Sequence, residues 1–170
     1  MRNKKTLLTV YTSLMAAIIF ISTFYLRLNI SPNGSYINLG DGMIFFTSVC
    51  LGPVSVIASI IGSCLADLLS GAVIYIPATF IIKGLMSLIT AIACKNKTQT
   101  FPFILKLLIF FDAEIIMVSG YFLYETVIFN YTYALLSIPW NLAQATFGII
   151  IGMVVFPFAV KFRKLISSSF

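Results

Sequence analysis

Six apolar runs, separated by short polar segments, make up most of this 170-residue chain. The runs cover residues 7–26, 43–51, 54–69, 74–94, 101–124 and 134–160. A membrane-crossing helix needs roughly 20 apolar residues, and a helix satisfies its own backbone hydrogen bonds in lipid. The pattern therefore predicts an all-α integral membrane protein, a six-transmembrane-helix bundle that forms one domain over residues 1–170. The second run is short, so we expect its helix to be tilted or to extend upstream.

Composition supports a membrane protein. Hydrophobic residues make up 60% of the chain and charged residues 9%, whereas about a quarter of the residues in a soluble domain are charged. So few charges leave too little polar surface to cover a water-soluble globule. The apolar run that follows MRNKK is longer than the ~7–15-residue apolar core of a secretory signal. We therefore interpret this run as a retained first helix.

The basic residues carry a topology signal. The net charge is +6, and the basic residues gather in the segments between apolar runs, which indicates membrane orientation and not a nucleic-acid partner. With six spans, the side that holds both termini receives Arg2, Lys4, Lys5, Lys95, Lys97, Lys106, Lys161, Arg163 and Lys164. Arg27 and Lys83 fall elsewhere. The positive-inside rule therefore predicts that the N and C termini are cytoplasmic.

One predicted outer loop runs directly into the second apolar run. Its sequence SPNGSYINLGDG contains turn formers and places Asn38 and Asp41 at the mouth of a helix. Polar side chains at that position have two interpretations. They contact a ligand that enters from outside, or Asp41 is an ordinary helix cap in a GDG turn. The sequence leaves both open.

Several polar side chains interrupt the other apolar runs. They are Asp67, Lys83, Asp112, Glu114, Asn141 and Gln144. Charged residues inside a membrane are costly and usually functional, and counting at 1.5 Å per residue puts most of these in the outer half of the bundle. Nearby aromatic residues are Tyr75, Tyr121, Tyr124 and Trp140. Stacking rings with a few fixed polar groups predict a pocket for a small polar ring compound.

Structural roles compete with this pocket. Lys83 could pair with Asp67 or Glu114 to hold helices together, and Asp112 could neutralise a neighbour. The aromatic residues could belong to an interfacial belt.

The first helix carries small residues at helical spacing. Thr9, Ser13 and Ala17 recur every four residues, as do Thr12 and Ala16. Such a stripe lets another helix approach closely. The approaching helix could belong to a partner protein or to this bundle itself.

Several chemistries lack their residues in this sequence. It has no His, no phosphate-binding glycine loop and no metal-binding motif, and its three cysteines show no paired spacing. We expect no cofactor, no bound metal and no ATP hydrolysis by this chain. Two rival hypotheses are an intramembrane acid–base enzyme that uses Asp67, Asp112 or Glu114, and a stand-alone carrier or small channel.

Three segments resemble one transporter family. YINLGDGMIFFTSVCLGP, IGSCLADLLSGAVIYIPATFIIKGL and IPWNLAQATFG are similar to signatures of the S components of energy-coupling factor (ECF) vitamin transporters. The resemblance covers nearly the whole chain. The branch it resembles is riboflavin-transporter-like, with members assigned to hydroxymethylpyrimidine or pyridoxine. The stripe on the first helix departs from the family, because Ser or Thr stands where the family often has Ala.

The resemblance implies a substrate-binding subunit in the bacterial plasma membrane. Such a subunit captures a vitamin at the outer face under the first loop, docks through its first helix on a membrane-embedded coupling subunit, and relies on two cytoplasmic ATPase subunits. The bundle is thought to topple in the membrane to release its cargo. The implied docking residues are Ser13, Ala16 and Ala17. The implied substrate-binding residues are Asn38, Asp41, Asp67, Tyr75, Lys83, Glu114, Asn141 and Gln144. A pyridoxine-like or pyrimidine-like ring is expected, with riboflavin as the alternative.

Overall fold

Helices dominate the computed structural model, which describes residues 4–29, 36–95 and 101–168. The elements in chain order are α1 (Lys4–Phe24), β1 (Arg27–Asn29), β2 (Tyr36–Asn38), α2 (Gly40–Leu51), α3 (Ser55–Leu69), α4 (Ile76–Ala93), α5 (Phe103–Ile128) and α6 (Tyr131–Ser168). Short 3₁₀ turns, Gly52–Val54 and Val73–Tyr75, precede α3 and α4. The all-helical prediction is confirmed apart from a two-stranded hairpin.

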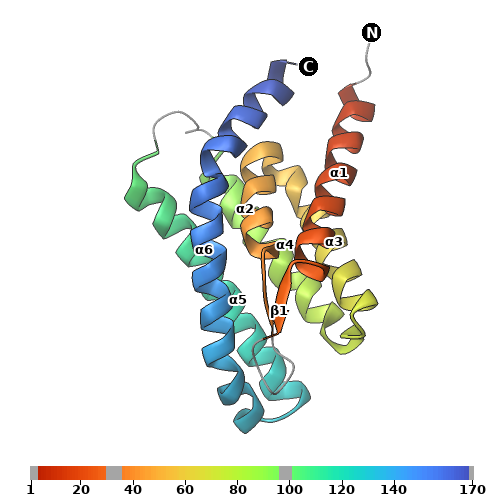
Figure 1. Cartoon of the computed structure of the whole chain (residues 1–170), viewed down its shortest axis with the longest axis vertical. Helices are drawn as coiled ribbons and strands as arrows, with labels where there is room; N and C mark the ends of the chain where they lie inside the picture. Colours follow the sequence, from red (N-terminus) through yellow and green to blue (C-terminus); the bar gives the residue numbers. More distant parts are fainter. Residues whose placement is uncertain (1–3, 30–35, 96–100, 169–170) are drawn as a thin grey trace.

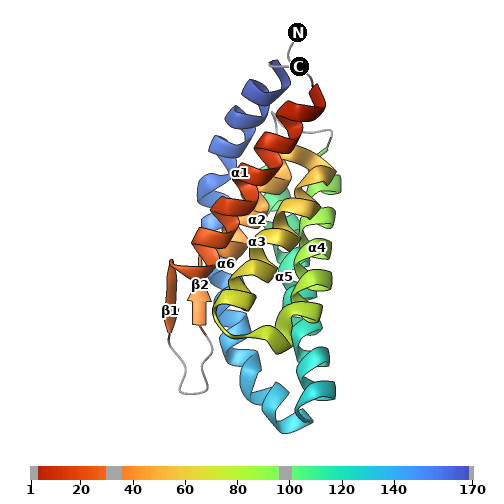
Figure 2. The ribbon, with the colours of Figure 1, turned by 90° about the vertical axis from the view of Figure 1, so that its right-hand side faces the viewer.

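The helices form an elongated bundle (Figures 1 and 2). The main contacts join α1 to α3, α3 to α4, α2 to α6, and α5 to α6. The α5–α6 connection extends beyond the other helices at the end opposite the termini (Figure 1). Large apolar side chains are exposed on the outside, among them Val127 at 82% and Phe158 at 64%. A surface of this kind suits contact with lipid.

The α2 helix is too short to cross a membrane. Its 12 residues span about 18 Å, less than the ~30 Å of a bilayer core. An antiparallel hairpin precedes it, with Arg27 opposite Asn38. The hairpin lies beside the bundle (Figure 2), so α2 begins part-way along the bundle and Asp41 in its first turn is buried, at 1% exposure. The sequence predicted a plain loop here and missed the strands.

The number of membrane spans remains a prediction. Within the described ranges, four segments are long and apolar enough to cross a membrane, namely Lys4–Phe24, Gly40–Leu69, Val73–Ala93 and Tyr131–Ser168. The second of these contains a turn at Gly52, whose φ of +61° favours glycine, and α2 and α3 run in opposite directions around it (Figures 1 and 2). The α5 helix lies outside this set.

The predicted outer loop ETVIFNYTY is largely helical. The α5 helix continues to Ile128 and α6 begins at Tyr131. The loop prediction for residues 125–133 was therefore wrong. Asn130 marks the turn between the two helices, and its side chain accepts a hydrogen bond from the Tyr133 backbone N–H at 2.8 Å.

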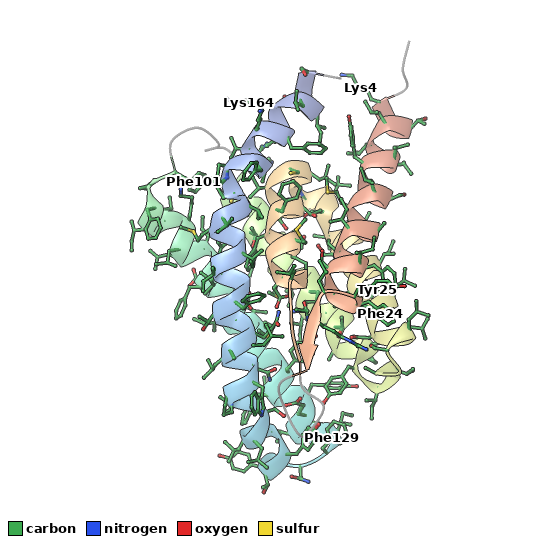
Figure 3. The ribbon with its side chains drawn as sticks, in the orientation of Figure 1. Lys4, Phe24, Tyr25, Phe101, Phe129 and Lys164 are labelled. Atoms are coloured by element: carbon green, nitrogen blue, oxygen red, sulfur yellow. The ribbon has the colours of Figure 1, made fainter. Side chains whose placement is uncertain are left out.

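Basic residues lie at the end of the bundle that holds both chain ends. Figure 3 shows Lys4 and Lys164 at this end and Phe129 at the opposite end. Arg163 ties α6 to the end of α4 by donating hydrogen bonds to the carbonyl oxygens of Cys94 and Lys95, at 2.9 and 2.8 Å. Lys4, Arg163 and Lys164 thus share one end of the bundle, and Arg2 and Lys97 lie outside the described residues. That this end is cytoplasmic stays a prediction from the charges.

The core is packed around closely approaching helices. The rings of Phe45 on α2 and Phe110 on α5 stack with centroids 4.4 Å apart. Gly152 of α6 faces both rings so closely that a Cβ atom there would clash with Phe45. Glycine at this position therefore allows α6 to pack closely against these two rings.

Adding bulk at Gly152 should destabilise the bundle. Gly152→Val is expected to lower the free energy of unfolding by about 1–3 kcal/mol, because overpacking displaces neighbouring side chains. Thermal unfolding of the purified protein in detergent measures the effect. Val154→Ile, at a side chain that is 61% exposed, is the matched control and should leave the melting temperature nearly unchanged. Equal melting temperatures for both variants would contradict the packing argument.

Candidate ligand-binding site

A cavity of about 200 Å³ lies between the helices, and every helix contributes to its wall. Thr23 is in the last turn of α1, Asp67 is near the end of α3, and Tyr133 is in the first turn of α6. Each of these helix ends points away from the end that holds the chain termini (Figure 1). The cavity therefore lies in the half of the bundle that the sequence predicts to face outward.

Helical periodicity aligns the lining residues. On α5 the cavity meets Met117, Tyr121 and Glu125, which are spaced four residues apart. The α3 helix presents Ser63 and Asp67 at the same spacing. Positions four apart share one helix face, so each helix turns one polar or aromatic stripe inward.

An ion pair joins the start of α2 to the middle of α4. Lys83 Nζ lies 2.5 Å from Asp41 Oδ1, and Gln144 of α6 donates a hydrogen bond from Nε2 to Asp41 Oδ2 at 2.7 Å. Lys83 and Gln144 are 9% and 7% exposed. The proposed pairing of Lys83 with Asp67 or Glu114 was therefore wrong, because the short α2 places Asp41 nearer to the lysine.

Asp41 is not a simple helix cap. Leu39 occupies the N-cap position of α2, and its own side chain makes no capping hydrogen bond. Asp41 lies within the first turn, where a negative charge is favoured by the positive end of the helix dipole. Its carboxylate is shared between Lys83 and Gln144. The alternative that Asp41 merely caps the helix is thus wrong.

Asn38 fastens the hairpin to the bundle. Its backbone N–H donates to Gln144 Oε1 at 2.8 Å, and its backbone oxygen accepts from Gln144 Nε2 at 3.3 Å. Its side-chain oxygen accepts from the Gly40 N–H at 2.7 Å, forming a tight turn at the start of α2. Gln144 therefore contacts both the hairpin and the ion pair.

Seven of the eight residues predicted for the substrate site line the cavity. They are Asn38, Asp41, Asp67, Tyr75, Lys83, Asn141 and Gln144. Glu114 lies outside the wall. It is 2% exposed, neither carboxylate oxygen has a hydrogen-bond partner in the described residues, and it packs beside Gly148 together with Asp41. Asp112 is exposed on the outer surface of α5.

Several lining residues keep unused hydrogen-bonding atoms, among them Asn141 and Asp67. Nδ2 of Asn141 and Oδ2 of Asp67 are buried, and neither meets a partner in the part of the chain that is described. Buried polar atoms are normally satisfied. Both residues line the cavity, so a ligand that reached these atoms would satisfy them.

Sequence reasoning missed Glu125 and Tyr133. Both line the cavity, and Tyr75 donates a hydrogen bond to Glu125 Oε1 at 3.1 Å. The missed signal was the four-residue repeat Met117, Tyr121, Glu125, which continues the helix past the predicted boundary at residue 124.

No metal centre accompanies these side chains in the described residues. Groups of three or more His, Cys, Asp or Glu side chains placed to hold an ion are not found there.

A separate groove runs along the outside of α1 and α3. Its volume is about 550 Å³, and its wall includes Ser13, Ala16 and Ala17 from α1 and Ile57 and Ile61 from α3. Ser13 and Ala17 are exposed, whereas Ala16 is 7% exposed and packs inward. The small residues therefore divide into an outward stripe and an inward one.

The chain was compared with known protein families. The family model for the S component of the ECF-type riboflavin transporter matches residues 3–161. The chain belongs to this family. An S component is the substrate-binding subunit of a vitamin transporter, so this chain is a multi-pass membrane transport protein and not an enzyme. Membership also implies, at the level of the family, a vitamin substrate and partner coupling and ATPase subunits.

One relative of this S component is an uncharacterized protein from the gap 3′ region of Pyrococcus woesei. It is 32% identical over 133 residues, which cover 78% of this chain and 87% of the relative. The similarity thus extends over most of both chains.

The S component should depend on its buried ion pair for stability. Lys83→Met is expected to lower the free energy of unfolding by about 3–5 kcal/mol, because Asp41 loses its cation. Combining it with Asp41→Asn removes both charges and should recover most of that loss. Melting temperatures of the single and double variants measure the coupling. Lys161→Met, at an exposed lysine, is the control, and a double variant no more stable than Lys83→Met would contradict the prediction.

Proposed function

We propose that this S component captures a small aromatic heterocycle with hydroxymethyl substituents, a pyridoxine-like or hydroxymethylpyrimidine-like ring, at the outer face of the membrane. The observation that carries the proposal is the cavity with its unused polar atoms on Asn141 and Asp67. Its volume of about 200 Å³ is below the ~300–1,000 Å³ of sites for drug-sized ligands. This size favours a single ring.

The cavity wall offers both contacts that such a ring needs. Trp140, Tyr75 and Tyr121 supply flat apolar surfaces, and aromatic rings stack with offset or edge contacts. Asn141 supplies a free N–H donor, and Asp67 a free acceptor. A ring with hydroxymethyl groups carries donors and acceptors at its rim, so it can stack on the aromatic side chains and form hydrogen bonds at the same time.

Riboflavin is the second candidate substrate. The description of the matching family names riboflavin, and this favours a flavin. Its three fused rings and ribityl chain need more room than the cavity offers, so the hairpin held by Asn38 and Gln144 would have to move. Purified protein that co-purifies with a yellow ligand would favour riboflavin over the smaller rings.

Delivery is proposed to follow the family arrangement in the bacterial plasma membrane, with cytoplasmic termini. The groove along α1 and α3 would receive the membrane-embedded coupling subunit, which two cytoplasmic ATPase subunits drive. Small exposed residues, Ser13 and Ala17, allow a partner helix to approach closely. Ala16 also lines the groove but is 7% exposed, so most of the proposed contact would come from Ser13 and Ala17.

Ligand binding should depend on Asn141. Asn141→Ala is expected to weaken binding of pyridoxine or hydroxymethylpyrimidine by about tenfold, the effect of ~1.5 kcal/mol for one lost hydrogen bond. Stability should hardly change, because the Asn141 Nδ2 atom has no partner in the described protein. Trp140, the chain's one tryptophan, lines the cavity, so its fluorescence reports the titration. Leu142→Ala, on the exposed face, is the control, and unchanged affinity for Asn141→Ala would refute its role.

Transport should fail when the groove is filled. Ser13→Trp with Ala17→Trp is expected to abolish uptake into proteoliposomes that contain the coupling and ATPase subunits, while ligand affinity stays within about threefold of wild type. Leu14→Trp with Ile21→Trp, at exposed α1 positions outside the groove, should preserve uptake. Normal uptake by the first pair would rule out this docking face. Uptake by the lone protein would instead support a stand-alone carrier.

A further inference from the structure

The charges that line the cavity do not balance. Asp41, Asp67 and Glu125 contribute carboxylates, and Lys83 is the one cation among the lining residues. Lys83 is already engaged by Asp41 at 2.5 Å. Asp67 and Glu125 therefore face the cavity without a paired lysine or arginine among the residues of its described wall.

Glu125 has an oxygen that the protein leaves unused. Its side chain is 5% exposed, and Oε1 accepts the hydrogen bond from Tyr75. Oε2 of Glu125 and Oδ2 of Asp67 are both buried, and neither has a hydrogen-bond partner in the described residues. A buried carboxylate oxygen without a hydrogen-bond partner is costly. Both acceptors gain most from a ligand that brings N–H donors.

Aromatic rings surround this end of the cavity. The Tyr75 ring lies 6.2 Å from Tyr121 and 6.1 Å from Phe129, measured between centroids. Phe129 in turn lies 4.6 Å from Tyr133, which also lines the cavity. The faces of such rings carry partial negative charge and attract cations. Rings and carboxylates together favour positive charge at the same place.

We propose that Glu125, assisted by Asp67, determines specificity by binding an amino or ammonium group on the ligand ring. The substrate class is then an aminated or cationic heteroaromatic compound. This inference rests on the proposed function and narrows it. The free amide of Asn141 binds an acceptor on the same ring, and the aromatic residues hold its faces.

A purely structural role for Glu125 makes a different prediction. The Tyr75–Glu125 hydrogen bond could do no more than connect the start of α4 to the end of α5. In that case loss of the carboxylate would weaken all ligands alike. In our proposal the loss depends on whether the ligand carries an amino group, so matched ligands separate the two roles.

Two matched probe pairs test the proposal in the detergent-purified full chain. The first is pyridoxamine and pyridoxine, which differ by an ammonium in place of a hydroxyl group. The second is a hydroxymethyl aminopyrimidine and the same pyrimidine without its amino group. Titrations followed by Trp140 fluorescence and by calorimetry compare the wild type with Glu125→Gln. Asp112→Asn removes an exposed carboxylate from the same helix and is the matched control.

The expected wild-type result is tighter binding of the aminated member in at least one pair, by about tenfold or more. Glu125→Gln should weaken that member by about 10- to 100-fold, the effect of losing a hydrogen bond to a charged group, and its partner by less than threefold. Asp112→Asn should match the wild type. If Glu125→Gln does not fold, the wild-type comparison and Asp67→Asn still decide the matter.

Three results would overturn the inference. If the wild type binds both members of each probe pair with equal affinity, the inference is refuted, whereas the proposal of a single-ring substrate still stands. Equal weakening of both members by Glu125→Gln assigns Glu125 a structural role. Binding of riboflavin, with none of the four probes bound, overturns the inference together with the proposed substrate class.

Discussion

The buried ion pair of Lys83 with Asp41, whose carboxylate also accepts a hydrogen bond from Gln144, constrains the rest of the structure. A lysine within an apolar bundle is tolerated only with a partner that neutralises its charge. Asp41 can supply that charge because α2 begins part-way along the bundle. The β1–β2 hairpin, in which Asn38 pairs with Arg27, returns the chain to the level at which α1 ends. Gln144 then joins the hairpin, the ion pair and α6. A short helix, a hairpin and one charged contact thus depend on one another.

The cost of polar residues in apolar runs explains which site residues the sequence could predict. Lys83, Asn141 and Gln144 interrupt long apolar runs, so their cost in a membrane marks them without any structure. The sequence could not predict the partner of Lys83, because that partner depends on how far α2 extends and on how the hairpin packs. Glu125 was missed because the predicted fifth apolar run ends at residue 124, whereas α5 continues to Ile128 and packs against α6. Distant pairings and helix ends are set by tertiary contacts.

The α3 helix links the two surfaces on which function is proposed to depend. Its inward stripe carries Ser63 and Asp67 into the cavity, and its outward residues Ile57 and Ile61 line the groove beside α1. Gly62 lies between these positions, and a Cβ atom there would clash with the Ala16 carbonyl oxygen and the Ile19 side chain of α1. The α1–α3 contact is therefore close, and a displacement of α1 by a docked partner would reach α3 directly. Coupling between the surfaces has a physical route through a single helix.

The Gln144 side chain connects the β1–β2 hairpin to the binding cavity. Gln144 uses its amide oxygen on the Asn38 N–H and its amide nitrogen on both Asn38 and Asp41. An amide nitrogen has two N–H donors and the oxygen two lone pairs, so these contacts occupy most of its capacity. A ligand that competes for Gln144 must therefore weaken either its hydrogen bonds to Asn38 of the hairpin or its hydrogen bond to Asp41 of the ion pair. Ligands that instead use the free atoms of Asn141, Asp67 and Glu125 leave the hydrogen bonds of Gln144 to the hairpin and to Asp41 intact.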